Sequence, residues 1–196
     1  FFDHDGWWHG QTLYDEVIQV PLVLKLSGGA LAGQVNANFA RHIDLAPTML
    51  RLAGLPKPEE MPGMTLVDNG VFKNDLTGHV YAEIDFEGSV LQAVRSRTEK
   101  LILANEGNWR ELDPVEYYDL QTDPQETTNI QADVPGRVQD LGLLIEGMVA
   151  FIQEGAAEPS VVDTISPDLA DQLNALGYGG NDPEAPPEDE SEKKPE

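Results

Sequence analysis

The chain has 196 residues, with 35 Asp and Glu against 12 Lys and Arg, a formal net charge of −23 and no cysteine. That length suits one domain or slightly more, and a hydrophobic share of 40% is enough for a packed core. The negative charge disfavours nucleic acids and anionic membranes as partners. The lack of cysteine excludes disulfides and thiolate sites within this sequence. No apolar run approaches the roughly 20 residues of a membrane span.

The two ends of the sequence differ in character. Residue 1 is Phe rather than Met, and no signal-peptide pattern follows it, so we expect the start to be a cut within a longer protein. Residues 181–196 are rich in acids and prolines and contain no large apolar side chain, which predicts a disordered acidic tail. We therefore expect three parts, residues 1–75, 76–180 and 181–196.

In the first part, Val17 to Leu26 is rich in aliphatic and β-branched residues and ends at glycines, which predicts a buried strand with parallel neighbours on both sides. His42 to Gly54 predicts a helix, with Asp44 as its cap and Gly54 at its left-handed end. The proline-rich stretch from Pro56 to Gly63 predicts a loop.

In the second part, alternating apolar residues predict an antiparallel meander, followed by an edge strand. Apolar residues then recur at intervals of three or four, which predicts an amphipathic helix covering one face of this small sheet. A serine, a first-turn proline and a glycine exit predict a short terminal helix. The expected strands are His79–Asp85, Val90–Arg97, Lys100–Ala104 and Glu116–Leu120, and the expected helices are Val134–Phe151 and Asp168–Gly177.

The first ten residues hold the densest group of chemically useful side chains. His4 and His9 are five residues apart, with Asp3 and Asp5 beside the first. Imidazole and carboxylate together suit a divalent metal or a site that handles an oxyanion. Judged on these residues alone, packing of the histidines against the neighbouring tryptophans is the stronger interpretation.

Four phrases along the chain, in this order, resemble the sulfatase family of the alkaline-phosphatase-like superfamily. Each phrase is weak to moderate evidence by itself, but together they span most of the sequence. They are His4 with His9-Gly10-Gln11-Thr12-Leu13-Tyr14-Asp15-Glu16 and Val20-Pro21-Leu22; His42-Ile43-Asp44-Leu45-Ala46-Pro47-Thr48-Met49-Leu50 with Leu52-Ala53-Gly54-Leu55; Tyr118 to Asn129; and Leu173-Asn174-Ala175-Leu176-Gly177-Tyr178.

The resemblance implies an α/β fold: this chain is the C-terminal portion of an alkaline-phosphatase-like α/β sandwich, plus a small antiparallel sheet with a packed helix. In such enzymes a Cys/Ser-x-Pro-x-Arg motif supplies a formylglycine nucleophile, and calcium neutralises the sulfate. No residues here match that motif. The resemblance places the calcium ligands just before Phe1, with Asp3 and His4 as the less favoured alternative.

By the same resemblance, His9 is the catalytic candidate, at a position that contacts the sulfate or the leaving-group oxygen. A cationic donor there suits the negative charge that develops on that oxygen. His4 falls at the pocket wall, in a supporting or substrate-contacting role, although Asp5 stands where the family usually has glycine. Trp8, like Trp7 and Trp109, is a candidate for stacking on a substrate ring, with ordinary packing as the alternative.

The remaining polar residues predict structure rather than chemistry. Tyr14-Asp15-Glu16 is expected to anchor the entry to the following strand. Arg95, Arg97 and Lys100 are expected to be solvated charges along a strand. Asp123-Pro124 and Asn129 are typical of turns that fix a last strand.

We therefore expect the intact protein to be a sulfatase that acts on a sulfated small molecule or glycan, and this chain to be inactive alone. The alternatives are a phosphodiesterase or phosphotransferase of the same superfamily and a non-catalytic acidic interaction module. The resemblance implies a periplasmic or extracellular location, and the oligomeric state stays open.

Overall fold

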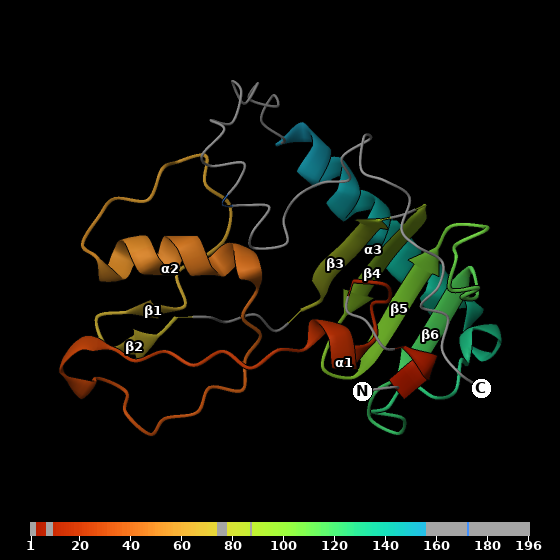
Figure 1. The fold of residues 1–196 in the computed structure, drawn as a ribbon, viewed down its shortest axis with the longest axis horizontal. Helices are drawn as coiled ribbons and strands as arrows, with labels where there is room; N and C mark the ends of the chain where they lie inside the picture. The colour runs from red at the N-terminus through yellow and green to blue at the C-terminus, as the bar shows by residue number, and fades with distance from the viewer. Residues whose placement is uncertain (1–2, 7–9, 74–77, 87, 156–171, 173–196) are drawn as a thin grey trace. The chain divides into compact units, whose positions relative to one another are not determined.

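The computed structural model describes residues 3–6, 10–73, 78–86, 88–155 and 172. The chain divides into two compact units, Phe1–Gly155 and Ala156–Glu196, and the description below concerns the first (Figure 1). The predicted helix Asp168–Gly177 lies outside the described residues except for Gln172, and the predicted tail at residues 181–196 lies outside them entirely. The predicted boundary between residues 75 and 76 stays a prediction.

Four antiparallel strands form the main sheet, as the alternating pattern predicts. Their spatial order follows the sequence, with β3 and β6 at the edges. Ala93 lies opposite Ile102, and Leu101 lies opposite Tyr117. The strands are β3 (Val80–Phe86), β4 (Ser89–Arg95), β5 (Glu99–Ala104) and β6 (Val115–Asp119).

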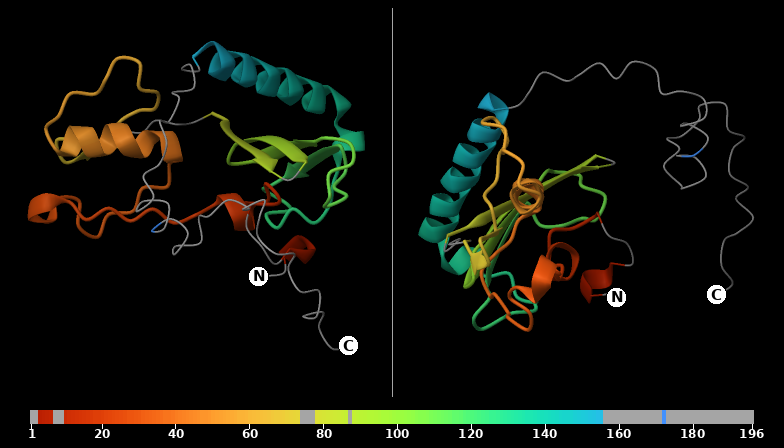
Figure 2. Two further views of the ribbon diagram at one scale, coloured as in Figure 1. Left: turned by 45° about the horizontal axis from the view of Figure 1, so that its top comes forward. Right: turned by 90° about the vertical axis from the view of Figure 1, so that its left-hand side faces the viewer.

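Helix α3 (Pro135–Glu154) covers one face of this sheet, which confirms the predicted amphipathic helix (Figure 2). Pro135 opens the helix, where its missing N–H costs nothing. Leu141 and Ile145 of α3, both 1% exposed, pack against Val94 and Leu101 of the sheet.

The N-terminal segment covers the other face. It includes the short helix α1 (Asp15–Ile18) and buries Leu13 and Tyr14 against Leu91 and Ile102. The sheet therefore has two separate apolar cores, one beneath α3 and one beneath residues 13–18. The fold is α/β, with the small antiparallel sheet and packed helix that the sequence predicts.

A second, smaller group of elements contains helix α2 (Leu45–Leu52) and the hairpin of β1 (Val67–Asp68) and β2 (Val71–Phe72). The helix lies within the predicted range, and Gly54 has the expected left-handed φ of 72°. Thr48 joins helix and hairpin, because its Oγ1 accepts a hydrogen bond from the Leu66 amide at 2.9 Å.

The predicted capping of α2 by Asp44 is wrong, because its side chain does not bind the free amides of the helix. Its carboxylate is fully buried and accepts hydrogen bonds from the Arg41 backbone and guanidinium and from the Met64 amide. Burial opposes the charged form, but these donors outweigh burial and lower the pKa of Asp44. Gly63 lies close by, where a Cβ would stand 2.0 Å from the Ile43 carbonyl oxygen.

The predicted buried strand Val17–Leu26 is wrong for this structure. Its first two residues belong to α1, the rest form no strand, and Val20 and Val23 are 59% and 88% exposed. An aliphatic run becomes a strand only when neighbouring strands satisfy its amides and carbonyls, and the described residues supply no such neighbour. Among the described residues, no helix has both the length and the apolarity to cross a membrane.

An ion-pair cluster fastens α3 to the sheet at Glu99. The Arg137 Nε donates to Glu99 Oε2 at 2.9 Å, the Tyr117 hydroxyl donates to the same oxygen at 2.8 Å, and His79 bonds to Oε1 at 3.0 Å. The hydrogen bonds from Arg137 are the main cause that lowers the pKa of Glu99 to about 2, while burial opposes them. In the same contact, burial and Glu99 raise the pKa of Tyr117 to about 12.

We expect Glu99→Gln to remove stability in a pH-dependent way. A carboxyl whose pKa falls on folding contributes stability that is complete above its unfolded pKa of roughly 4.5 and is lost as pH falls toward about 2. The difference in free energy of unfolding between the wild type and this variant should therefore stay constant above about pH 5 and shrink below roughly pH 4.5. Urea titrations at fixed pH values measure it.

The control is Glu146→Gln, which removes an exposed carboxylate from α3, the helix that Glu99 holds through Arg137. This variant should differ little from the wild type. A difference for Glu99→Gln that does not change between pH 5 and pH 2.5 would contradict the role of the Glu99 cluster.

Candidate functional site

The structure describes some of the predicted site residues and leaves others undescribed. His9 and Trp8, together with Trp7, lie outside the described residues. Asp3 and His4 are described, in a short 3-10 helix at Asp3–Asp5, where Asp3 is exposed. Trp109 is 45% exposed and lies 5.9 Å from the Arg110 guanidinium. The site therefore has to be built from His4 and from the segment that begins at Gly10.

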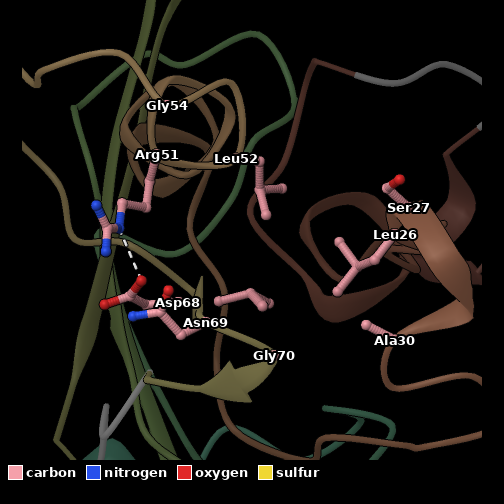
Figure 3. Close-up of a pocket in the computed structure, with 10 residues that line it drawn as sticks. Leu26, Ser27, Ala30, Arg51, Leu52, Gly54, Asp68, Asn69 and Gly70 are labelled. Carbon is pink, nitrogen blue, oxygen red and sulfur yellow. Dashed lines mark hydrogen bonds and ion pairs between the residues drawn. The ribbon is translucent and has the colours of Figure 1, made fainter.

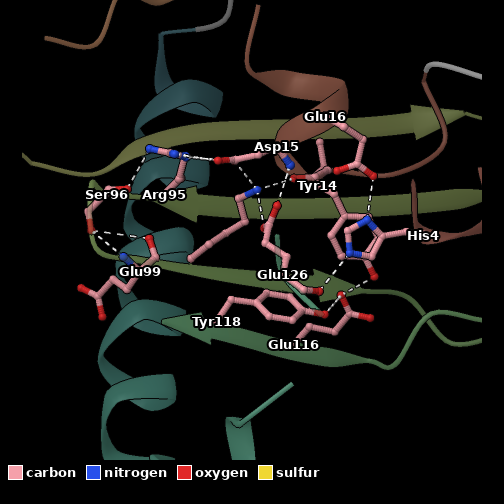
Figure 4. Close-up of polar contacts among 12 residues, drawn as sticks. His4, Tyr14, Asp15, Glu16, Arg95, Ser96, Glu99, Glu116, Tyr118 and Glu126 are labelled. Carbon is pink, nitrogen blue, oxygen red and sulfur yellow. Dashed lines mark hydrogen bonds and ion pairs between the residues drawn. The ribbon is translucent and has the colours of Figure 1, made fainter. Parts of the chain in front are cut away.

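His4 lies in a closely fitted polar setting (Figure 4). Its ring stacks on Tyr14 with centroids 3.7 Å apart, its Nδ1 lies 2.7 Å from Glu16 Oε1, and its Nε2 lies 2.9 Å from the Glu126 carbonyl oxygen. Arg110 donates to the His4 carbonyl at 2.6 Å. These contacts hold His4 at a left-handed φ of 48°, which a residue with a side chain seldom adopts unaided.

Both ring nitrogens of His4 therefore face groups that accept hydrogen bonds. An imidazole that donates from both nitrogens is protonated. Burial lowers the pKa of His4, but the hydrogen bonds to the Glu126 carbonyl and to Glu16 outweigh burial, so the net shift is upward. As placed, His4 has no ring nitrogen free for a ligand. Of the two roles that the sequence leaves open, supporting and substrate-contacting, this favours the supporting role.

Lys100 lies at the centre of the network and is fully buried. Its Nζ is 2.6 Å from Asp15 Oδ1, 2.6 Å from Glu126 Oε1 and 3.0 Å from the Leu13 carbonyl oxygen. The ammonium group donates a hydrogen bond to the Leu13 carbonyl, and both carboxylate oxygens lie at ion-pair distance from it. The contacts connect strand β5 with α1 and with the turn after β6.

Arg95 balances the second carboxylate charge of this cluster. Its Nη2 lies 2.6 Å from Asp15 Oδ2, and its Nε bonds to both oxygens of that carboxylate. Burial raises the pKa of Asp15, but the hydrogen bonds from Arg95 and the charge of Lys100 outweigh burial and lower it. Two cations thus face two carboxylates, Asp15 and Glu126, in a region from which water is largely excluded.

Glu116 is a third buried carboxylate. It contacts Tyr14, the residue on which the His4 ring stacks. The hydroxyls of Tyr14 and Tyr118 both donate to Glu116 Oε2, at 2.9 and 3.1 Å. Burial raises the pKa of Glu116 despite these two bonds. Burial and the nearby carboxylate also raise the pKa of both tyrosines, so their hydroxyls stay protonated and keep donating.

The structure corrects the expectation that the basic residues of β4 and β5 are solvated. Lys100 is fully buried and Arg95 keeps only 13% of its side chain exposed, whereas Arg97 is exposed as predicted. The cause is the N-terminal segment, which lies across this face of the sheet and brings Asp15 with it. Lys100 lies two residues before Ile102 and therefore on the same face of β5. This alternation along the strand could have predicted that Lys100 is buried.

Of two other predictions about polar residues, the one for the turn at Asp123 is confirmed, and the one for Tyr14-Asp15-Glu16 needs correction. Tyr14-Asp15-Glu16 anchors the chain, although it does so on the main sheet and not at the entry to a strand. Asp123 accepts bonds from the Thr127 hydroxyl and the Thr128 amide, and Asn129 Oδ1 accepts one from the Tyr117 amide. These are the turn bonds that fix β6.

A separate pocket of about 400 Å³ lies between the loop that contains Leu26 to Ala30 and the α2–β1 region (Figure 3). Its polar lining includes Arg51 and Asp68, whose side chains form an ion pair at 2.7 Å. None of the predicted site residues lines it. It therefore adds nothing to the site around His4.

The described residues do not fit a calcium site. Within that part of the chain, no group of three or more His, Asp or Glu side chains is placed to hold a metal ion. The buried carboxylates of Asp15, Glu116 and Glu126 are engaged by Lys100, Arg95 and tyrosine hydroxyls. The arrangement can hold a backbone segment in place, but by itself it offers no metal chemistry.

Comparison with known proteins places these features in context. Residues 3–141 match the protein family described as N-sulphoglucosamine sulphohydrolase, C-terminal. An N-acetylglucosamine-6-O-sulfatase of Bacteroides thetaiotaomicron is 27% identical over 157 residues, which are 74% of this chain and 27% of that protein. A choline-sulfatase of Rhizobium meliloti is 30% identical over 147 residues, or 70% of this chain and 26% of that protein.

A solved structure of a protein in complex with its substrate, D-glucosamine-2-N,6-O-disulfate, is also similar. It shares 24% identity and a TM-score of 0.46 with this chain, over 61% of this chain and 25% of the other. The chain thus spans about a quarter of the length of the curated relatives named above.

We expect Lys100→Met to destabilise the fold by about 3–5 kcal/mol, because removing the buried cation leaves Glu126 buried without its charge partner, while Asp15 keeps Arg95. Urea unfolding of the 196-residue chain, followed by circular dichroism, measures the loss. The matched control is Arg97→Met, which removes an exposed cation of the same sheet region and should cost several-fold less. Equal losses for the two variants would contradict the central role of Lys100.

Proposed function

The chain belongs to the family described as N-sulphoglucosamine sulphohydrolase, C-terminal, and from this we propose that the intact protein is a sulfatase that hydrolyses sulfuric esters, with this chain as its C-terminal part. The observation that carries the proposal is the family match over residues 3–141. The sulfatases among its relatives support it. The alternatives, a phosphotransfer enzyme and an acidic interaction module, are outcomes of the test below.

We propose a sulfated glucosamine unit, free or within a glycan, as the first substrate to test. The family description names N-sulphoglucosamine, and the Bacteroides relative is named for N-acetylglucosamine 6-O-sulfate. The choline-sulfatase shows that relatives of similar identity are named for other sulfate esters, so aryl and choline sulfates belong in the same panel.

We propose that His9 donates a hydrogen bond or a proton to the sulfate or the leaving-group oxygen. Cleavage of a sulfate ester places negative charge on that oxygen, and a cationic donor stabilises the charge. Support comes from the described residues on either side, because His4 and Leu13 are both held by the buried network. Trp8 is proposed to contact the substrate ring, and His4 to support the segment.

The family suggests a metal cofactor, for which we propose calcium, and when bound it supplies positive charge against the sulfate oxygens. We place its ligands, and the formylglycine, outside these residues, since the sequence contains no Cys/Ser-x-Pro-x-Arg motif. The residues of this chain bind, orient and donate. The family also suggests a periplasmic or extracellular location for the intact protein, and the net charge of −23 gives no support to a nucleic-acid partner.

The intact protein, expressed from its full reading frame, should release inorganic sulfate from at least one sulfated glucosamine, whereas the 196-residue chain alone should release none. Ion chromatography of the reaction measures sulfate directly. The same protein is offered nitrophenyl phosphate and a phosphodiester. Release of phosphate with no sulfate would favour the phosphotransfer alternative, and release of neither would favour the interaction module.

His9→Ala in the intact protein should lower kcat by about 10²–10⁴-fold, the usual contribution of a positioned proton donor. Steady-state sulfate release on the best substrate of the panel measures it. The control is His42→Ala, which removes an exposed histidine of the same chain and should leave kcat within about twofold of the wild type. An unchanged kcat for His9→Ala would remove His9 from the reaction.

A further inference from the structure

The segment from Val20 to Leu24 exposes consecutive aliphatic side chains. Leu22 and Leu24 are 44% and 41% exposed, and Val23 between them is 88% exposed. Successive side chains of an extended chain point to opposite sides, so an extended segment with this sequence has two apolar faces. A strand that is apolar on both faces is typical of a sheet that is covered on each side.

The backbone of the same segment has no partners in the part of the chain that the structure describes. Residues 20–25 belong to no helix or strand there, and they run as a plain trace in Figure 1. Among the described residues, their amides and carbonyls form no hydrogen bond with other backbone groups. Water satisfies these groups while the segment is exposed, but once it is covered they need the hydrogen bonds of neighbouring strands. Pro21 is compatible with this, because a strand tolerates proline at its first residues.

Helix α2 also turns apolar side chains toward solvent. It buries Thr48, whereas Met49 and Leu52 are exposed. A helix at the surface of a finished protein normally has the reverse arrangement, with its apolar side chains covered. Leu52 and Leu26 both line the pocket of about 400 Å³ described above, so exposed apolar residues of α2 and of the chain after residue 25 border the same hollow (Figure 3).

This exposure is local, because the same chain buries aliphatic residues completely elsewhere. Leu91, Val94 and Leu101 of the main sheet are fully buried. Single exposed aliphatic residues are ordinary, but a continuous run of them marks a surface that contacts another chain or another part of the same chain. Residues 20–24 and α2 therefore carry an unfinished interface.

The length of the relatives indicates what covers this interface. The chain spans about a quarter of the curated relatives named above, and its family description is C-terminal. A protein of the relatives' length has about three times as many residues outside this chain as within it. A second copy of this chain, paired about a two-fold axis, would meet the segment along one edge and leave the other edge open.

We propose that residues 20–25 form an interior strand of a sheet whose other strands belong to the part of the intact protein outside these 196 residues, and that α2 packs against the same part. This inference rests on the proposed function only in taking this chain as the C-terminal part of a longer protein. It requires no particular substrate and no catalytic residue.

The first test measures amide hydrogen exchange in the intact wild-type protein, by mass spectrometry of its peptides. The amides of Leu22, Val23 and Leu24 should exchange at least about 10²-fold more slowly than unpaired amides, because ladder hydrogen bonds protect them. Val35 is the internal control, since it is 92% exposed and its amide has no backbone partner among the described residues. Rapid exchange at residues 22–24 would overturn the proposal.

The second test compares Val23→Asp with Val35→Asp in the intact protein. The pair is matched, because both valines are almost fully exposed in this chain. Val23→Asp should lower the unfolding midpoint by several degrees, since it places a carboxylate within a covered sheet, whereas Val35→Asp should change it little. If Val23→Asp does not fold, Val23→Ala and Val35→Ala repeat the comparison with a smaller expected loss. Equal midpoints for the two members of a pair would contradict the inference.

Neither readout requires catalysis, so the outcomes separate this inference from the proposed function. A protein that releases no sulfate but protects residues 22–24 would overturn the proposed function and support the inference. Light scattering on the same samples reports the oligomeric state. Protection that persists in a monomer supports the inference, and protection that is lost when an oligomer dissociates on dilution would assign the surface to a second copy and overturn it.

Discussion

The burial of the Lys100 ammonium is the constraint on which the arrangement of this chain depends. A fully buried cation is tolerated only when carboxylates and carbonyls surround it, and here they come from Leu13, Asp15 and Glu126. Glu126 is more than 100 positions away from Leu13 and Asp15 along the chain. Satisfying one ammonium group therefore requires the N-terminal segment and the turn after β6 to meet on β5.

The two faces of the sheet are covered by different means. Beneath α3 the contacts are mainly apolar, through Leu141 and Ile145, with the Glu99 cluster at the margin. Beneath the N-terminal segment, a similar apolar core is combined with a chain of buried polar bonds. A helix that repeats its apolar contacts every turn can shift slightly at little cost, but a segment held by an ammonium and a carboxylate cannot.

The sequence predicts the parts of the fold that depend on local pattern. The strands of the meander and helix α3 follow from periodicity, and the turn at Asp123 follows from its residue types. Prediction from the sequence fails where the structure of a segment depends on a partner that is distant along the chain. Lys100 on a half-buried strand is equally compatible with solvent and with a buried carboxylate, and Val17–Leu26 becomes a strand only beside neighbours that the described residues lack. In the candidate site, the anchoring role of Tyr14–Glu16 is predictable, whereas the role of Lys100 is not.

Two of the four phrases that carry the sulfatase resemblance have a structural explanation. Leu13 to Glu16 and the turn around Glu126 are the two sides of the Lys100 network. What they encode is the docking of the N-terminal segment on the sheet, a requirement that is the same for any reaction carried out beside it. Family membership and reaction are therefore separate questions for this chain. The match establishes the first, while the second is a property of the intact protein, which is why the decisive measurement is made on the intact protein.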